Sequence, residues 1–238
     1  MKKLGVIGGL GPMASAYYLE RVTQMTDAQV DQEHIEVLLH SCPQIPDRTG
    51  FILGKSDENP LPMMIEVGKN LEKQGAEVIA IPCITAHYFE DALSREFSIP
   101  IIDALGATAE YLSERGIRAA GLMATDGTVS CGLFQKRLHD KGIECILPDE
   151  DNQRVVMSII YDDVKKGNPI SYEKFQKVLR SLKGQGAEVV ILGCTELSVV
   201  KRDFTMPPGV IDVIDVLSRA AVLRCGKLKS EYEQLITR

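Results

Sequence analysis

One stretch of this chain occurs twice. The segment QGAEVIAIPCITAH at residues 74–87 returns as QGAEVVILGCTELS at residues 185–198. In both copies, a glycine and an acidic residue precede a short apolar run, VIAI or VVIL. Such a run is too short for a helix and is typical of a strand buried in a parallel sheet. Cys83 and Cys194 therefore hold equivalent positions, each at the end of a buried strand and before a segment compatible with a helix.

The rest of the chain alternates predicted strands with predicted helices in both halves. In the first half, the patterns predict strands at 4–8, 34–40, 78–81 and 100–103, helices at 14–24, 63–74 and 107–115, and a loop at 41–54. In the second half, they predict strands at 119–124, 143–147 and 189–192, and helices at 133–141, 152–166 and 172–185. Strands that alternate with helices form parallel sheets covered on both faces. The duplication therefore predicts an α/β fold with two pseudo-symmetric lobes, each a mostly parallel sheet flanked by helices.

Composition and charge exclude several classes of protein. The chain has 238 residues, a net charge of −6 and no basic run, which argues against nucleic acid or an anionic membrane as a partner. No apolar run reaches the roughly 20 residues that a membrane span requires. The N-terminus resembles a signal peptide, but its glycines and Pro12 interrupt the apolar stretch and its first strand is needed by the fold. The six cysteines form no CxxC pairs, which favours a reducing cytoplasm and no structural metal.

The predicted positions of Cys83 and Cys194 favour proton-transfer chemistry. Side chains at the carboxyl ends of parallel strands point into the crevice where ligands bind. A helix N-terminus stabilises negative charge and so favours a thiolate. Two lobes that face each other would place one thiol on each side of a bound molecule, as required to remove a proton from one face of a carbon and return one to the other. The structural alternative is two buried cysteines that only end their strands.

Several motifs resemble those of the aspartate/glutamate racemase family, most closely its aspartate racemase branch. They are PCITAH, GCTE, the GGLGP opening, Pro46-Asp47-Arg48-Thr49 and ATDGT. The resemblance runs nearly end to end and implies that Cys83 and Cys194 are the acid/base residues of a racemase that needs neither pyridoxal phosphate nor metal. It also implies an active site between the lobes, with residues 1–100 and 208–238 in the first lobe and 101–207 in the second. A cytoplasmic homodimer that acts on a small amino acid is the further implication.

The substrate-binding residues are predicted from the same motifs. A racemase without a cofactor must stabilise a carbanion with preorganised donors. The hydroxyls of Thr85 and Thr195 and the backbone N–H groups after each cysteine are candidates, with Leu10 as a lining residue and Thr128 as a further hydroxyl. By the resemblance, Arg48 and Lys165 match positions that hold a substrate carboxylate. Solvated surface charge is the alternative for both.

One residue departs from the family pattern. Ile84 stands where the family usually has asparagine, and an isoleucine side chain offers no hydrogen bond to a carboxylate or an amine. The two thiols and both threonines still favour racemisation. Aspartate is the expected substrate, with glutamate or a broader set of amino acids as alternatives, and Ile84 leaves the choice among them open.

Three other functions remain as alternatives. The GLGPMA segment at 9–14 fits a dinucleotide-binding fingerprint, but no acidic residue ends the second predicted strand, and Pro12 removes an N–H that would face a pyrophosphate. A decarboxylase or isomerase of the same superfamily would use one thiol only. A protein that binds an acidic metabolite without catalysis would need neither thiol.

Overall fold

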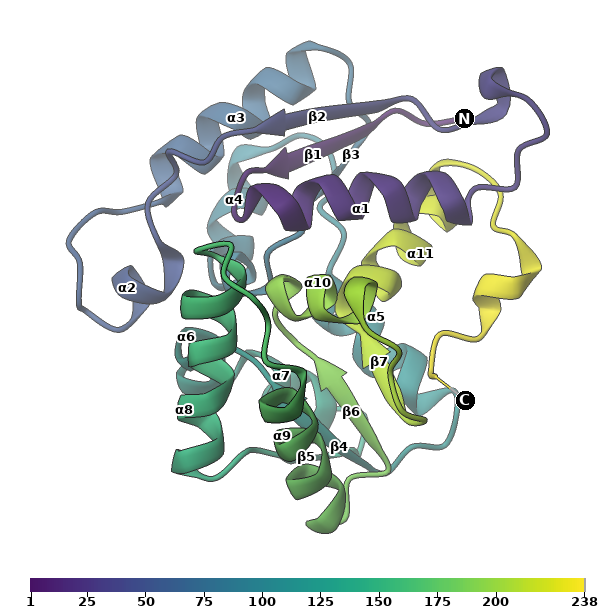
Figure 1. Cartoon of the computed structure of the whole chain (residues 1–238). Helices are drawn as coiled ribbons and strands as arrows, with labels where there is room; N and C mark the ends of the chain where they lie inside the picture. Colours follow the sequence, from purple (N-terminus) through teal and green to yellow (C-terminus); the bar gives the residue numbers. More distant parts are fainter. Residues whose placement is uncertain (238) are drawn as a thin grey trace.

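The structure, a computed structural model, describes residues 1–237, and its first three strands form one parallel sheet (Figure 1). The strand order is β2-β1-β3. The central strand β1 is buried at every position, as expected for a strand covered on both faces. The strands span Leu4–Gly8 (β1), Val37–Ser41 (β2) and Val78–Ala80 (β3).

Helices cover this sheet and connect its strands. Helix α1 begins at Pro12, where the missing N–H and the fixed φ of proline suit the first helical position. The α-helices are α1 (Pro12–Met25), α2 (Arg48–Ile52), α3 (Leu61–Lys73), α4 (Glu90–Glu96) and α5 (Ala104–Ser113). Two 3₁₀ helices, η1 (Asp31–Glu33) and η2 (Ile84–Phe89), complete this half.

The second half builds a second parallel sheet with the order β5-β4-β6-β7. Its strands span Ala119–Met123 (β4), Glu144–Ile146 (β5), Val189–Leu192 (β6) and Val210–Asp212 (β7). The helices are α6 (Asp126–Ser130), α7 (Leu133–His139), α8 (Glu150–Ser158), α9 (Tyr172–Gly184), α10 (Thr195–Asp203) and α11 (Val213–Cys225). A π-helix, η3 (Ile159–Val164), continues α8, and a 3₁₀ helix, η4 (Ser230–Glu233), follows α11.

The duplicated segments supply equivalent strands. In the first sheet β3 pairs with the central strand β1, and in the second sheet β6 pairs with β4 in the same parallel sense. The predicted α/β class, with two sheets flanked by helices, is therefore confirmed.

Three local predictions were wrong. The segment predicted as a loop at 41–54 contains α2, because the Asp47 carboxylate accepts a hydrogen bond from the backbone N–H of Gly50 and caps the helix. The predicted strand at 34–40 starts only at Val37. Residues 100–103 form a single bridge between Ile79 and Ile101, because Asp103 already caps α5.

The last part of the chain connects the two halves. Strand β7 lies at the edge of the second sheet, whereas α11 packs against α1 and α5 (Figure 1). The lobe boundaries at residues 100 and 207 remain predictions. No helix among residues 1–237 is both long enough and apolar enough to cross a membrane.

Candidate active site

The two duplicated cysteines end equivalent strands. Cys83 follows β3 and precedes η2, and Cys194 follows β6 and precedes α10. Both residues have extended backbone conformations, with φ of −154° and −134°. Both side chains are buried and neither is in a disulfide. The fold thus repeats, in each half, a free thiol at the point where a strand gives way to a helix.

Both thiols line one cavity. The cavity collects every residue that the sequence predicted for the site except Thr128. Its lining is Leu10, Asp47, Arg48, Thr49, Cys83, Ile84, Thr85, Thr125, Tyr161, Lys165, Cys194, Thr195 and Glu196. The cavity is narrow, with a volume of about 10 Å³, so a substrate enters it only when lining side chains move.

Thr128 takes part through a cluster of hydroxyls. The Oγ1 atoms of Thr85, Thr125 and Thr128 lie 3.0–3.1 Å from one another, and all three side chains are buried. Thr85 comes from the first half of the chain, whereas the other two belong to the start of α6. The cluster therefore joins the two halves beside the cavity and fixes the orientation of the Thr85 hydroxyl.

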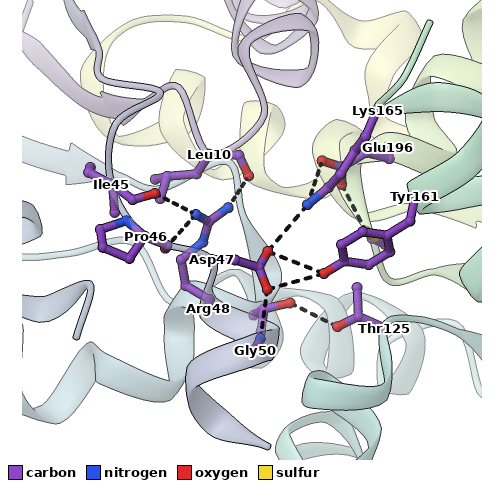
Figure 2. Close-up of polar contacts among 12 residues, drawn as sticks. Leu10, Ile45, Pro46, Asp47, Arg48, Gly50, Thr125, Tyr161, Lys165 and Glu196 are labelled. Carbon is purple, nitrogen blue, oxygen red and sulfur yellow. Dashed lines mark hydrogen bonds and ion pairs between the residues drawn. The ribbon is translucent and has the colours of Figure 1, made fainter. Parts of the chain in front are cut away.

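Arg48 is held by backbone carbonyls. Its Nη1 donates to the carbonyls of Ile45 and Pro46 at 3.1 and 2.9 Å, and its Nη2 donates to the carbonyl of Leu10 at 2.8 Å (Figure 2). Burial lowers the pKa of Arg48, but its contacts with Cys83, Asp47 and Glu196 together outweigh this effect and raise the pKa. The guanidinium is thus fixed between the glycine turn and the loop before α2, next to Cys83.

Lys165 lies between two carboxylates. Its Nζ is 3.6 Å from Oδ1 of Asp47 and 4.0 Å from Oε1 of Glu196, and it lies 4.3 Å from the centre of the Tyr161 ring (Figure 2). The Tyr161 hydroxyl donates to the Asp47 carboxylate at 3.2 Å. Tyr161 belongs to η3, and Lys165 is the first residue after this helix. π-Helical turns often occur at functional sites, and this one presents both residues to the cavity.

The environments of the two thiols differ. The Sγ of Cys194 donates to Oε2 of Glu196 at 2.9 Å. Burial raises the pKa of Cys194 well above its usual value, and the charge of Glu196 and the hydrogen bond to it raise the pKa further. Cys83 instead lies beside the Arg48 cation. The surroundings of Cys194 therefore favour its protonated thiol, whereas Cys83 has a cation as its neighbour.

The sequence analysis assigned no site role to five residues of this cavity: Asp47, Thr49, Thr125, Tyr161 and Glu196. For two of these residues, the sequence contains a signal that could have identified them. Glu196 holds the place in the second repeat that Thr85 holds in the first, two residues after the cysteine. An aspartate such as Asp47 is typical of the residue that caps the start of a helix, because its carboxylate accepts a hydrogen bond from a backbone N–H two or three residues later. Nothing in the sequence placed Tyr161 next to Asp47, because that contact joins distant segments.

One other group of side chains has metal-ligand types in proximity. Ligand atoms of His87, Glu90 and Asp103 lie within 4.8 Å of one another. However, Nδ1 of His87 is 2.8 Å from a Glu90 oxygen, and the guanidinium of Arg137 lies 3.0 Å from Asp103. Both carboxylates therefore already have side-chain partners, and none of the three residues lines the cysteine cavity.

Several known proteins with similar structures or sequences are named as racemases. The chain superimposes on the Picrophilus torridus aspartate racemase with a TM-score of 0.83 and 30% identity, over 98% of each chain. It is 24% identical to the broad specificity amino-acid racemase RacX of Bacillus subtilis (strain 168), over 92% of this chain and 96% of that one. The Francisella tularensis glutamate racemase shares the fold, with a TM-score of 0.66 and 18% identity, over 94% of this chain and 81% of that one.

The family profile described as Asp/Glu/Hydantoin racemase matches residues 7–221, a span that holds both duplicated cysteines and all the lining of their cavity. This chain belongs to the Asp/Glu/hydantoin racemase family.

Proposed function

We propose that this protein is an amino-acid racemase independent of pyridoxal phosphate that moves the α-proton between Cys83 and Cys194. The observation that carries the proposal is the shared cavity, which two free thiols from equivalent strand ends line together. Family membership and the similarity to an aspartate racemase and to a broad specificity amino-acid racemase support the same reaction.

The two thiols take complementary roles in each direction of the reaction. In one direction Cys83, beside Arg48, is the base that removes the α-proton from one face of the substrate. Cys194, hydrogen-bonded to Glu196, is the thiol that donates a proton to the opposite face. A C–H bond breaks as an S–H bond forms at Cys83, and the S–H bond of Cys194 breaks as the new C–H bond forms. The product is the opposite enantiomer, with Cys83 protonated and Cys194 anionic.

The carbanion between these two steps needs donors that are already in place. The hydroxyls of Thr85 and Thr195 line the cavity, and the cluster with Thr125 and Thr128 holds Thr85 in position. The Glu196 backbone N–H and the Lys165 ammonium both lower the pKa of Cys194, so they stabilise the thiolate that the reaction leaves there. Donors fixed before the reaction need no reorganisation when the charge develops.

Isotope exchange tests the proposal. We expect that a single enantiomer, incubated in deuterated water, gains deuterium at Cα and is converted to the opposite enantiomer. Proton NMR measures the first change and chiral chromatography the second. The panel includes aspartate and glutamate, which the names of similar racemases specify, together with neutral amino acids. Exchange at Cα without inversion would indicate an enzyme that uses one thiol only, as in the decarboxylase or isomerase alternative. Binding without exchange for every amino acid would indicate a binding protein.

Cysteine variants assign the two roles. Cys83→Ala and Cys194→Ala should each lower racemisation at least 1000-fold, because each removes one of the two bases. Cys131→Ala is the matched control, since Cys131 is free but does not line the cavity. Full racemisation by either active-site variant would refute the two-thiol mechanism.

The resemblance also predicts a cytoplasmic homodimer that supplies D-amino acids. Light scattering of the purified protein measures the mass and so checks the dimer. A mass of one chain at micromolar concentration would contradict it.

A further inference from the structure

A second pocket adjoins the cysteine cavity. This outer pocket has a volume of about 420 Å³, far more than the cavity that holds the thiols. The two spaces share Leu10, Asp47, Arg48, Lys165 and Glu196 as lining residues, so they adjoin along these side chains. Figure 2 shows these side chains, with Lys165 directed between Asp47 and Glu196. The outer pocket therefore offers room for a bulky part of a molecule whose α-carbon lies between the thiols.

The rest of the outer pocket is apolar. Three residues come from the start of α1, two from the loop before α2, one from η3 and one from α10. They are Pro12, Met13, Ala14, Pro43, Ile45, Val164 and Val199, together with Gly9 and Gly11 of the glycine turn. Among the described residues, the only charged ones that line this pocket are the four at its junction with the cavity.

The charges at the junction are already balanced. Arg48 and Lys165 are the cations and Asp47 and Glu196 the anions, so their sum is zero. Arg48 donates three Nη hydrogen bonds to backbone carbonyls and forms no ion pair with a carboxylate among the described residues. Lys165 lies within 4.0 Å of both carboxylates. If Arg48 receives the α-carboxylate of an amino acid, a second carboxylate on the substrate meets only Lys165, which Asp47 and Glu196 already share, so its desolvation is costly.

The position after Cys83 also offers no neutral donor to a second carboxylate. Ile84 occupies the position after Cys83 and is buried against the hydrophobic core. Its side chain contributes only apolar surface to the cavity that it lines. An uncharged side chain loses no hydrogen bond there, whereas a carboxylate would have to give up its hydration.

We infer that the outer pocket holds the substrate side chain and that the preferred substrates are neutral amino acids with apolar side chains of about the size of methionine or leucine. This inference rests on the proposed racemase function. It assigns the apolar residues around Val164 and Val199 to side-chain recognition. Burial of a side chain of this size against apolar walls favours binding.

A substrate panel tests this inference separately from the racemase function. Exchange of α-hydrogen in deuterated water is measured for methionine, leucine, alanine and aspartate. We expect kcat/KM for methionine and leucine to exceed that for aspartate at least tenfold. Faster exchange of aspartate than of methionine and leucine would overturn the inference and leave the racemase intact. No exchange with any amino acid would refute the racemase function itself.

A variant that fills the outer pocket locates the recognition site. Val164→Phe adds volume to the wall and should lower the ratio of kcat/KM for methionine to that for alanine at least tenfold, because the alanine methyl group does not reach this far. The ratio is independent of the fraction of folded enzyme. Val30→Phe, at a position 53% exposed and outside the pocket, is the matched control.

A second variant tests the same prediction at an exposed position, in case Val164→Phe disturbs folding. Met13 is 54% exposed at the start of α1 and also lines the pocket, so Met13→Trp narrows the pocket without disturbing the core. It should lower the same ratio. An unchanged ratio in both variants would show that the substrate side chain lies elsewhere.

Discussion

The Sγ atom of Cys194 lies 2.9 Å from Oε2 of Glu196. The equivalent position in the first repeat, two residues after Cys83, is Thr85, whose hydroxyl bonds to other threonines rather than to the thiol. The duplication thus gives both halves the same strand and the same cysteine, and the position two residues after the cysteine gives only Cys194 a carboxylate partner.

Removal of the Glu196 charge should change the pH profile. Burial, then the charge and hydrogen bond of Glu196, raise the pKa of Cys194, so Glu196→Gln lowers this pKa. Cys194 acts as an acid when Cys83 removes the α-proton, and the acid form is lost as pH rises through the pKa. The alkaline limb of kcat/KM for that enantiomer should therefore move to lower pH.

The control for this prediction is Glu150→Gln, since the Glu150 side chain is 96% exposed. Rate measurements across pH 6–10 on both variants decide the outcome. A profile for Glu196→Gln that coincides with that of the unmodified enzyme would show that Glu196 does not set the protonation of Cys194.

Gly11 should be required for the contact between Glu196 and Cys194. A Cβ added at Gly11 would lie 2.7 Å from Oε1 of Glu196, too close for two unbonded atoms. The φ of −125° suits any residue, so Gly11→Ala should displace the carboxylate without straining the backbone. We expect at least a tenfold loss of kcat in racemisation assays, with thermal unfolding nearly unchanged.

Gly184→Ala is the matched control, because no atom lies within 4 Å of a Cβ added there. If Gly11→Ala keeps full activity, Glu196 can move without consequence for the reaction.

Loss of Arg48 should destabilise the fold as well as the site. Arg48→Met leaves the buried carbonyl oxygens of Leu10, Ile45 and Pro46 without their donor. Each unsatisfied buried group is costly, so we expect the free energy of unfolding to fall by at least about 2 kcal/mol. Urea titration followed by circular dichroism measures the change.

Arg202→Met is the comparison for Arg48→Met. Arg202 pairs with Asp203 at a partly exposed position, so its removal should cost less than about 1 kcal/mol. Equal losses in the two variants would contradict a structural role for Arg48.

Asp212 should make stability depend on pH. Burial, with the charge of Asp215 adding to it, raises the pKa of Asp212 from 3.8 to about 6, although Lys201 and hydrogen bonds from Ser198 and Ile214 oppose the shift. The folded protein then binds this proton more tightly than the unfolded chain does. The stability that protonation of Asp212 contributes is complete below about pH 4 and is lost as pH rises through about 6.

The variant Asp212→Asn isolates this contribution. The free energy of unfolding is measured for the unmodified protein and for Asp212→Asn at each pH. The difference, unmodified protein minus variant, should fall by about 2–3 kcal/mol between pH 4 and pH 7. Asp203→Asn, at a partly exposed position, should give no such difference. A constant difference between the unmodified protein and Asp212→Asn across this range would show that Asp212 titrates normally.

Local sequence patterns predicted β1 to β6 but not β7, and they predicted α1, α3, α5, α7, α8 and α9. The apolar runs at β1, β3, β4 and β6 are continuous because these strands are buried on both faces, and a continuous run is visible without an alignment. Two of the wrong predictions lie where an aspartate side chain caps the start of a helix. Asp47 capped a helix inside an expected loop, and Asp103 ended an expected strand to cap α5.

The sequence by itself determined that two cysteines end equivalent strands, because the repeat is written in residue types and spacing. Only the tertiary structure decided what surrounds each thiol. Arg48 reaches the cavity from the start of α2, and Tyr161 and Lys165 reach it from a π-helix and the residue after it, all distant in sequence from the cysteines. Glu196 is directed at Cys194 by the first turn of α10. The reason is physical: spacing along a chain fixes local hydrogen bonds, whereas the electrostatic environment of a buried group depends on whichever segments pack around it.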